Sequence, residues 1–118
     1  MPRFIKPLAL AGALALAVPA YAGTAVHEGK QLFQANCAEC HHSDGRGGVN
    51  FGDVTSADLR APGLERTYRH DDALIVRAIL FGKDESGQPL NAPMPKWSGQ
   101  LSVAQAQDIV AYLHTLKR

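Results

Sequence analysis

The chain's two cysteines lie in one short stretch, CAECHH, at residues 37–42. Cys37, Cys40 and His41 stand at positions i, i+3 and i+4, so on a helix their side chains project from one face. Two thiols and one imidazole on the same face can bind a single flat ligand. His42 points about 100° further around the helix, which predicts a surface position or a supporting role rather than a competing ligand.

The CxxCH spacing is typical of covalent haem attachment, in which two sulfurs form thioethers with the haem vinyl groups and the adjacent histidine ligates the iron. The simplest alternative is a disulfide, structural or redox-active, in an oxidising compartment. However, no βαβ pattern of a thioredoxin-like domain is present, and a disulfide leaves the long loops described below unexplained. A zinc site would need a fourth ligand and more than one pair of cysteines. We therefore predict one haem c with its iron, held by Cys37, Cys40 and His41.

The iron's sixth ligand separates two kinds of function. An iron held by one imidazole either keeps an open face, for oxygen or peroxide chemistry, or gains a second protein ligand and carries electrons. Met94 is the one methionine besides Met1. It lies in Ala92-Pro93-Met94-Pro95, where the two prolines stiffen the loop and remove two amide donors. We predict that Met94 ligates the iron; the alternative is a methionine that fills a gap in the core.

Three further histidines are rival ligands to Met94. His27 lies ten residues before Cys37 and is expected on the same helix. That helix carries the haem motif, so the His27 side chain is poorly placed to reach the opposite face of the haem. His114 belongs to the last predicted helix but lies off its apolar stripe. His70, just before the second predicted helix, is the rival ligand that we retain.

Three stretches with the apolar period of a helix must position these ligands. The first covers residues 26–35 and continues toward the cysteines. The second covers residues 71–81, with acidic residues in its first turn and Gly82 as its stop. The third begins with a capping-box pattern at residues 102–105, and the basic residues 117–118 close it, which suits the negative end of a helix dipole.

Two long loops separate these helices. About thirty residues, rich in Gly, Asp and Ser, lie between the first and second helices, with at most one short helical turn around residues 58–60. Residues 82–100 form the second loop, and no strand pattern appears in either. Loops of this length are unusual in a small domain unless they surround something. The sequence therefore predicts an all-α fold in which three helices and two long loops wrap around a bound group.

Residues 1–22 have the features of a secretory signal peptide. Two basic residues precede an uncharged run at residues 8–18, and Ala20-Tyr21-Ala22 is a small-x-small cleavage pattern. The run has 11 residues, fewer than the roughly 20 that span a bilayer, so we expect cleavage near Ala22 and no stable membrane insertion afterwards. The predicted divisions are the signal peptide and one exported domain, residues 23–118.

The charge balance of the exported domain excludes some partners. Without the signal peptide the chain keeps 10 of its 12 basic side chains against 11 acidic ones. It has no basic tract, so we expect no nucleic acid partner. The near-neutral balance also predicts no strong basic face for long-range steering toward acidic proteins, which mildly favours a dedicated partner.

With these motifs in place, the chain resembles the class I monohaem cytochromes c, the small soluble bacterial kind, over residues 24–116. GKQLFQANCAECHHSDGRGG is similar to that family's first helix and haem motif. APMPKW, followed by LSVAQAQDIVAYLHTL, is similar to its methionine loop and C-terminal helix. The resemblance implies the cytochrome c fold for residues 23–118. It also implies that Gly29 and Phe33 on the first helix cross against Tyr112 on the last.

The resemblance further implies a proline-containing loop behind the axial histidine. The matching residues are Ala61-Pro62-Gly63-Leu64, in which the Pro62 carbonyl would accept the proton on His41 Nδ1 and Leu64 would pack on the haem. Pro62 follows His41 by 21 residues, farther than in the most familiar members, and an ordinary turn is the alternative. The sequence does not choose among four candidates for contact with the haem propionates: Arg60, Tyr68, Arg77 and Trp97.

These features predict a periplasmic one-electron carrier that takes electrons from a donor dehydrogenase and passes them to an acceptor oxidase or reductase. With His41 and Met94 both on the iron, no substrate reaches the metal, so we expect no catalysis and a reduction potential on the high side. The main alternative is an electron-relaying cytochrome subunit of a periplasmic dehydrogenase complex. A haem enzyme or gas sensor with an open iron is the third possibility.

Overall fold

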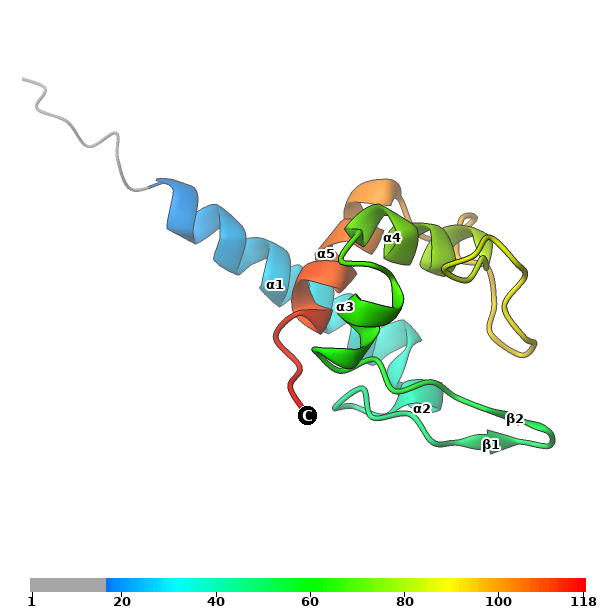
Figure 1. Ribbon diagram of the computed structural model, residues 1–118. Coiled ribbons are helices and arrows are strands. Elements are labelled where there is room, and N and C mark those ends of the chain that lie inside the picture. Colours follow the sequence, from blue (N-terminus) through cyan, green and yellow to red (C-terminus); the bar gives the residue numbers. More distant parts are fainter. Residues whose placement is uncertain (1–16) are drawn as a thin grey trace, which may run out of the picture.

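The computed structural model describes residues 17–118, so most of the predicted signal peptide, residues 1–16, lies outside the described residues. Helices and one two-stranded hairpin follow one another along this part of the chain (Figure 1). Among these residues, no helix combines the length and the apolar character that crossing a membrane requires. The elements are α1 (Ala17–Asn36), α2 (Ala38–His41), β1 (Asn50–Phe51), β2 (Val54–Thr55), α3 (Gly63–Thr67), α4 (Asp72–Phe81) and α5 (Val103–Leu113).

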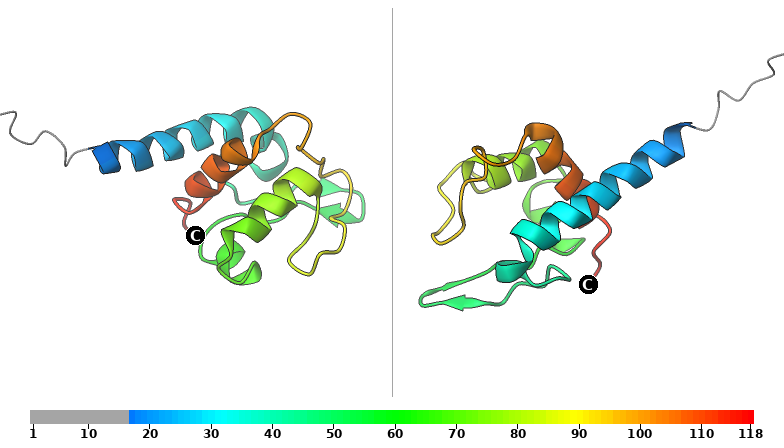
Figure 2. Two further views of the ribbon diagram at one scale, coloured as in Figure 1. Left: turned by 90° about the horizontal axis from the view of Figure 1, so that it is seen from above. Right: turned by 180° about the vertical axis from the view of Figure 1, so that it is seen from behind.

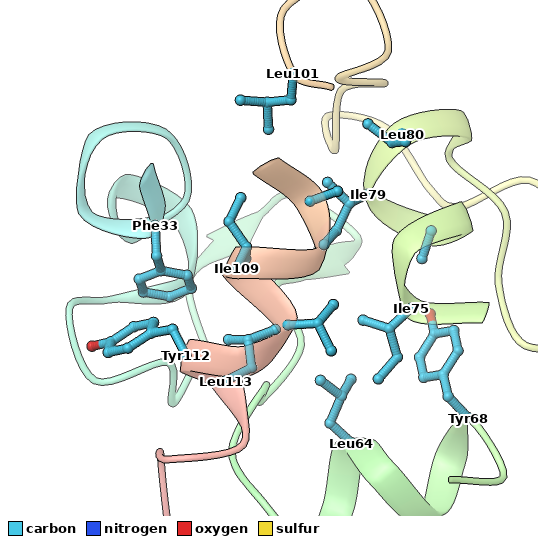
Figure 3. Close-up of a cluster of buried hydrophobic side chains, with 13 residues drawn as sticks. Phe33, Leu64, Tyr68, Ile75, Ile79, Leu80, Leu101, Ile109, Tyr112 and Leu113 are labelled. Carbon is cyan, nitrogen blue, oxygen red and sulfur yellow. The ribbon is translucent and has the colours of Figure 1, made fainter. Parts of the chain in front are cut away.

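The first and last helices cross closely, as the resemblance implies. α1 begins before the predicted residue 26, and α5 lies across it (Figure 2). A Cβ added at Gly29 on α1 would overlap the backbone carbonyl of Asp108 on α5. Further along α1, the rings of Phe33 and Tyr112 have centroids 5.4 Å apart and are tilted by 53° (Figure 3). The predicted crossing is confirmed, and glycine is what allows the two backbones to approach.

The predicted boundaries of α4 are confirmed by its caps. The Asp71 side chain accepts a hydrogen bond of 3.0 Å from the Ala73 backbone N–H. This bond satisfies one of the amide groups that a helix start leaves without a partner. At the other end, Gly82 adopts the left-handed conformation, with φ 64°, and its N–H donates to the Ala78 carbonyl. α4 therefore has the start and stop that its sequence predicts.

The start of α5 is confirmed, but its predicted end is wrong. Gln105 N donates to Ser102 Oγ (3.1 Å), and Ser102 N donates to Gln105 Oε1 (2.9 Å), which completes the predicted capping box. The helix ends at Leu113, so the basic residues 117–118 lie beyond it and do not close it. They instead pair with the segment before α3, where Ala61 and Lys117 form a parallel β-bridge.

The loop after the cysteines is more ordered than the sequence predicts. β1 and β2 pair antiparallel, with Asn50 opposite Thr55 and Phe51 opposite Val54. Gly52 supplies the positive φ, 70°, that a two-residue hairpin turn needs. The single predicted helical turn at residues 58–60 is also wrong, because the short helix in this loop is α3. Strands of two residues and a helix of five are too short to give a periodic signal.

One apolar core holds α1, α4 and α5 together and extends to α3 (Figure 3). Aromatic rings fill its α1–α5 side, and branched aliphatic chains fill the space between α4 and α5. Since one wall of this core also borders the cavity described next, the packing of the helices positions the site. The buried members are Phe33, Leu64, Tyr68, Ile75, Ala78, Ile79, Leu80, Leu101, Ala106, Ile109, Val110, Tyr112 and Leu113.

Candidate functional site

The cysteine motif forms a tight turn that joins α1 to α2. Cys37 N donates to the Phe33 carbonyl (2.8 Å), which continues the pattern of α1, and His41 N donates to the Cys37 carbonyl (2.9 Å). The second bond spans four residues, so Cys37 and His41 keep helical spacing although Cys37 itself separates α1 from α2. Cys37, Cys40 and His41 all line one cavity, as their spacing predicts.

Both cysteines are free thiols in a setting that keeps Cys37 protonated. Burial, and then the charge of Cys40, raise the pKa of the Cys37 thiol to about 11. Reactive thiolates of redox-active CxxC pairs need the opposite shift. The surroundings of Cys37 therefore do not favour the reactive thiolate that a disulfide-exchanging pair needs.

The axial histidine candidate is oriented by one backbone hydrogen bond. His41 is 9 % exposed, and its Nδ1 lies 2.9 Å from the Ala57 carbonyl oxygen. Because a carbonyl only accepts, Nδ1 must carry the proton, which leaves the Nε2 lone pair free to bind a metal. Burial lowers the pKa of His41, and the bond to Ala57 opposes this in part. A neutral imidazole with a fixed tautomer is the form that ligates iron.

The prediction that Pro62 accepts the His41 proton is wrong. The Pro62 carbonyl accepts from the Arg66 backbone N–H (3.1 Å) and so belongs to the first turn of α3. Ala57 takes its place, 16 residues after His41. The pair Ala57 and Leu59 has the same spacing as Pro62 and Leu64, and all of these except Pro62 line the cavity. Because the spacing is the same, it does not distinguish the two pairs, and the proline favoured the wrong one.

The cavity has a volume of 540 Å³ and is open to the surface. The end of α1 and α2 form one part of its wall, the hairpin a second part, and α3 with α4 a third. Residues 90–97 complete it, and α5 lies behind. Its walls are mainly apolar, as in most small-ligand sites. The apolar lining includes Phe33, Leu59, Leu64, Ile75, Ile79, Leu90, Ile109 and Leu113.

Met94 lines the same cavity as His41, and the rival histidines do not. Met94 is partly exposed, and its backbone N–H donates to the Asn91 carbonyl (3.2 Å). His27 and His70 are exposed, on α1 and before α4 respectively. His114 is held elsewhere, with Nδ1 2.5 Å from Glu65 Oε1. Of the sulfur and imidazole groups in residues 17–118, the cavity therefore brings together two thiols, one imidazole and one thioether.

This donor set and this wall fit a haem. Two thiols from one turn can each form a thioether, a neutral imidazole can bind iron from one side, and a thioether is a suitable weak second ligand. Residues 26–117 match the family model described as cytochrome c. The chain belongs to the cytochrome c family. It is therefore an electron-transfer haem protein with haem c as its cofactor, an electron carrier rather than a catalytic enzyme.

Relatives of two kinds align with this cytochrome c. Cytochrome c6 of Thermosynechococcus vestitus is 31 % identical over 112 residues, which cover 94 % of this chain and 88 % of cytochrome c6. The cbb3-type cytochrome c oxidase subunit FixP of Azorhizobium caulinodans is 33 % identical over 92 residues, 78 % of this chain. The cytochrome bc1 complex cytochrome c subunit of Corynebacterium diphtheriae is 38 % identical over 93 residues, also 78 % of this chain. The chain spans only 27 % of each of these two subunits.

Two of the four propionate candidates of this cytochrome c line the cavity, and two do not. Tyr68 and Trp97 are part of its wall. Arg60 instead donates two side-chain hydrogen bonds to Asp58. Arg77 donates from Nη2 to the Asp84 carbonyl (2.9 Å), which ties the loop after α4 to that helix.

The hairpin is the other part of the site that sequence reasoning missed. Phe51, Val54 and Thr55 line the cavity, and Phe51 is 37 % exposed there. An aromatic side chain in the wall of an open apolar cavity adds apolar surface that a bound ligand can contact. The Gly52 turn was the only local signal for this wall, and one glycine among many in the loop does not identify a hairpin.

Proposed function

We propose that this cytochrome c is a one-electron carrier whose haem is attached through Cys37 and Cys40 and ligated by His41 and Met94. The observation that carries the proposal is that these four side chains line one cavity, and that no other histidine or methionine of residues 17–118 lines it. When bound, the haem supplies an iron that exchanges one electron between its ferric and ferrous states.

The chain's own residues hold and insulate that group. Ala57 fixes the tautomer of His41, so the imidazole presents Nε2 to the cavity. Leu59 and Leu64 line the same wall and exclude water from it. A poorly hydrated site with a thioether ligand favours the less charged ferrous form, so we expect a potential on the high side. Tyr68 and Trp97 are the proposed donors to the propionates.

Replacement of the proposed sixth ligand tests this arrangement. Met94→Ala should lower the midpoint potential by on the order of 100 mV, because axial ligands set haem potentials over a range of about 0.8 V. It should also abolish the weak sulfur-to-iron charge-transfer absorption of the ferric protein. Redox titration and a visible spectrum measure both effects.

His70→Ala is the matched control for Met94→Ala, since it removes the rival ligand and should change neither the potential nor the spectrum. The opposite pattern, an unchanged Met94→Ala spectrum with an altered His70→Ala spectrum, would reject Met94. Rapid binding of carbon monoxide by the wild-type ferrous protein would instead indicate an open iron and support the haem enzyme or gas sensor.

We also propose that the protein works in the periplasm after cleavage near Ala22. The support is the basic start of residues 1–22, their short uncharged run and the Ala20-Tyr21-Ala22 pattern. Mass spectrometry of the protein purified from its source tests this. A mature chain that begins near Gly23 is expected, and a chain that retains residues 1–22 would contradict export by cleavage.

A second candidate function is that of a cytochrome subunit in a larger electron-transfer complex, such as a periplasmic dehydrogenase. Two of the aligned relatives are named as subunits of an oxidase and of the bc1 complex, and this favours the candidate. A free carrier should elute from gel filtration of the native extract as a small monomer. A subunit should elute with its enzyme, and the co-eluting protein would identify the donor or acceptor.

A further inference from the structure

The loop that orients His41 is held from behind by the segment that follows α5. We define residues 56–62 as the proximal loop and residues 116–118 as the tail segment. Ala61 N donates to the Leu116 carbonyl (2.7 Å), and Arg118 N donates to the Ala61 carbonyl (3.2 Å). The two segments therefore pair as neighbouring strands of a parallel β-bridge.

A charged cluster reinforces this pairing next to Ala57. Arg60 donates from Nε to Asp58 Oδ1 (3.0 Å) and from Nη2 to Asp58 Oδ2 (2.9 Å). Arg118 Nε of the tail segment lies 3.5 Å from Asp58 Oδ2. The hydrogen bonds from Arg60 are the main cause that lowers the pKa of Asp58 to about 2, so Asp58 is ionised at neutral pH. The carboxylate of Asp58, the residue that follows Ala57, thus contacts both Arg60 and the tail segment.

The cysteine-motif side restrains the same loop. Leu59 N donates to the Gly45 carbonyl (2.7 Å), and Gly47 N donates to the His41 carbonyl (2.9 Å). A Cβ added at Gly47, whose φ is 64°, would overlap the Ala57 carbonyl. The carbonyl that accepts the His41 proton therefore packs against the Gly47 backbone and has little room to move.

From these contacts we propose that Arg60 is a positioning residue which, with Asp58 and Arg118, locks the proximal loop to the tail segment, keeps the Ala57 carbonyl on His41 Nδ1 and so tunes the reduction potential. This rests on the proposed role of His41 as the axial ligand. The proximal loop lies between β2 and α3 and belongs to neither, so its order depends on these contacts and on the hydrogen bonds of Ser56 with residues 48–49. A firm hydrogen bond to Nδ1 makes the imidazole a stronger donor, which stabilises the ferric state and lowers the potential.

Arg60→Ala tests the proposal because its two possible effects on the potential have opposite signs. Loss of a cation, with Asp58 left unpaired, stabilises the ferric state through space and lowers the potential. Loss of the firm bond to His41 raises the potential. We expect the reduction potential to rise on balance. The equilibrium constant for reduction should increase by a factor of about ten or less, and a factor of ten corresponds to about 59 mV for one electron.

The hydrogen bond itself is observed by nuclear magnetic resonance of the haem-loaded ferrous protein. In Arg60→Ala, the His41 Nδ1 proton should exchange with solvent about tenfold faster than in the wild type, because the loop opens more often. Arg60→Lys, which keeps the charge and one hydrogen bond, should restore most of the protection. Arg118→Ala, which removes one exposed side chain, should give a smaller change in the same direction and provides a test if Arg60→Ala does not fold.

The chain contains a matched control with the same local chemistry. Arg46 pairs with Asp44 two residues earlier, and Asp44 Oδ1 accepts from the Arg46 backbone N–H, as Asp58 does for Arg60. Both partners are about half exposed, and neither pairs with the tail segment. Arg46→Ala should therefore leave the proton exchange unchanged and not raise the potential.

Two outcomes would count against the proposal in different ways. If Arg60→Ala and Arg118→Ala behave like Arg46→Ala in both measurements, the charged cluster only stabilises the fold. If the wild-type protein itself lacks a protected His41 Nδ1 proton and the spectrum of an imidazole-ligated haem, the proposed role of His41 fails first.

Discussion

At the scale of single residues, the site depends on groups whose chemistry is set by burial. Cys37 is a partly buried thiol whose pKa is raised to about 11, and His41 is a buried imidazole whose pKa is lowered. Both shifts favour the uncharged forms. These uncharged groups suit the proposed roles, in which the thiol becomes a thioether and the imidazole donates a lone pair to iron.

The attachment chemistry leads to a residue-scale prediction. The double variant Cys37→Ala and Cys40→Ala should release all of its haem into acidified acetone, because no thioether remains, whereas the wild type should keep its colour in the precipitate. Absorbance of the two fractions measures this. Each single variant should still retain haem through one bond, and colour retained by the double variant would exclude covalent attachment at these sulfurs.

The ligand types were predictable at this scale, but the orienting carbonyl was not. Cys37, Cys40 and His41 can be identified from the sequence alone, because their residue types are rare and their spacing is specific. The acceptor for His41 Nδ1 is a backbone carbonyl, which every residue has, so its identity depends on the path of the chain. That path is set by the hairpin, which brings Ala57 rather than Pro62 to His41.

At the scale of elements, the crossing of α1 and α5 is the contact that carries the cysteine motif. Gly29 lies against the Asp108 carbonyl, and α1 runs from this crossing directly to Cys37. The rings of Phe33 and Tyr112 extend the contact toward the motif. The position of Cys37 relative to the cavity is thus fixed by how closely the two helices approach.

Gly29→Ala should force these helices apart. The added methyl would meet backbone rather than a flexible side chain, so we expect the free energy of unfolding to fall by about 1–3 kcal/mol. Urea unfolding of the haem-loaded protein, followed by circular dichroism, measures it. Gly63→Ala is the control, because a Cβ there has nothing within 4 Å, and its stability should stay within about 1 kcal/mol of the wild type. Equal effects of both substitutions would show that the crossing is not tight.

The helices were predictable from sequence because their caps are local signals. Ser102 with Gln105 marks the start of α5, and Asp71 with Gly82 bounds α4, each through side chains or backbone conformations within a few residues. β1, β2 and α3 lack such signals. Elements of two to five residues are stable only through contacts with the rest of the chain, which a local pattern does not contain.

At the scale of the whole molecule, His114 joins three helices at one point. It caps the end of α5, and its two ring nitrogens contact Glu65 on α3 (Nδ1, 2.5 Å) and Asp72 on α4 (Nε2, 2.9 Å). The hydrogen bond with Glu65 is the main cause that raises the pKa of His114, and the same bond lowers the pKa of Glu65. Protonated His114 therefore bridges two carboxylates that hold α3 and α4 to α5.

The sign of the resulting pH dependence follows from the raised pKa of His114. The folded state binds this proton more tightly than the unfolded state, so the bridge contributes fully below the unfolded pKa of about 6.5 and is lost as pH rises through the higher folded value. The His114 side chain is 38 % exposed, so solvent screening limits the contribution to about 1 kcal/mol or less. Urea unfolding between pH 6 and pH 9 should show this loss of stability.

Two histidine variants separate this bridge from other titrating groups. His114→Gln removes the bridge. Its loss of stability above pH 6.5 should therefore be smaller than that of the wild type by the contribution of the bridge, about 1 kcal/mol or less. His70 and Lys117 also act on Glu65 through their charge. The His70 backbone N–H donates to the Glu65 carbonyl (2.8 Å), but neither side chain forms a hydrogen bond with the Glu65 carboxylate, which pairs with His114. His70→Gln should therefore keep the wild-type pH dependence. If the stability of His114→Gln falls with rising pH as steeply as that of the wild type, the contacts with Glu65 and Asp72 do not hold the three helices together in solution. In that case the packing of the apolar core alone positions α3 at the cavity.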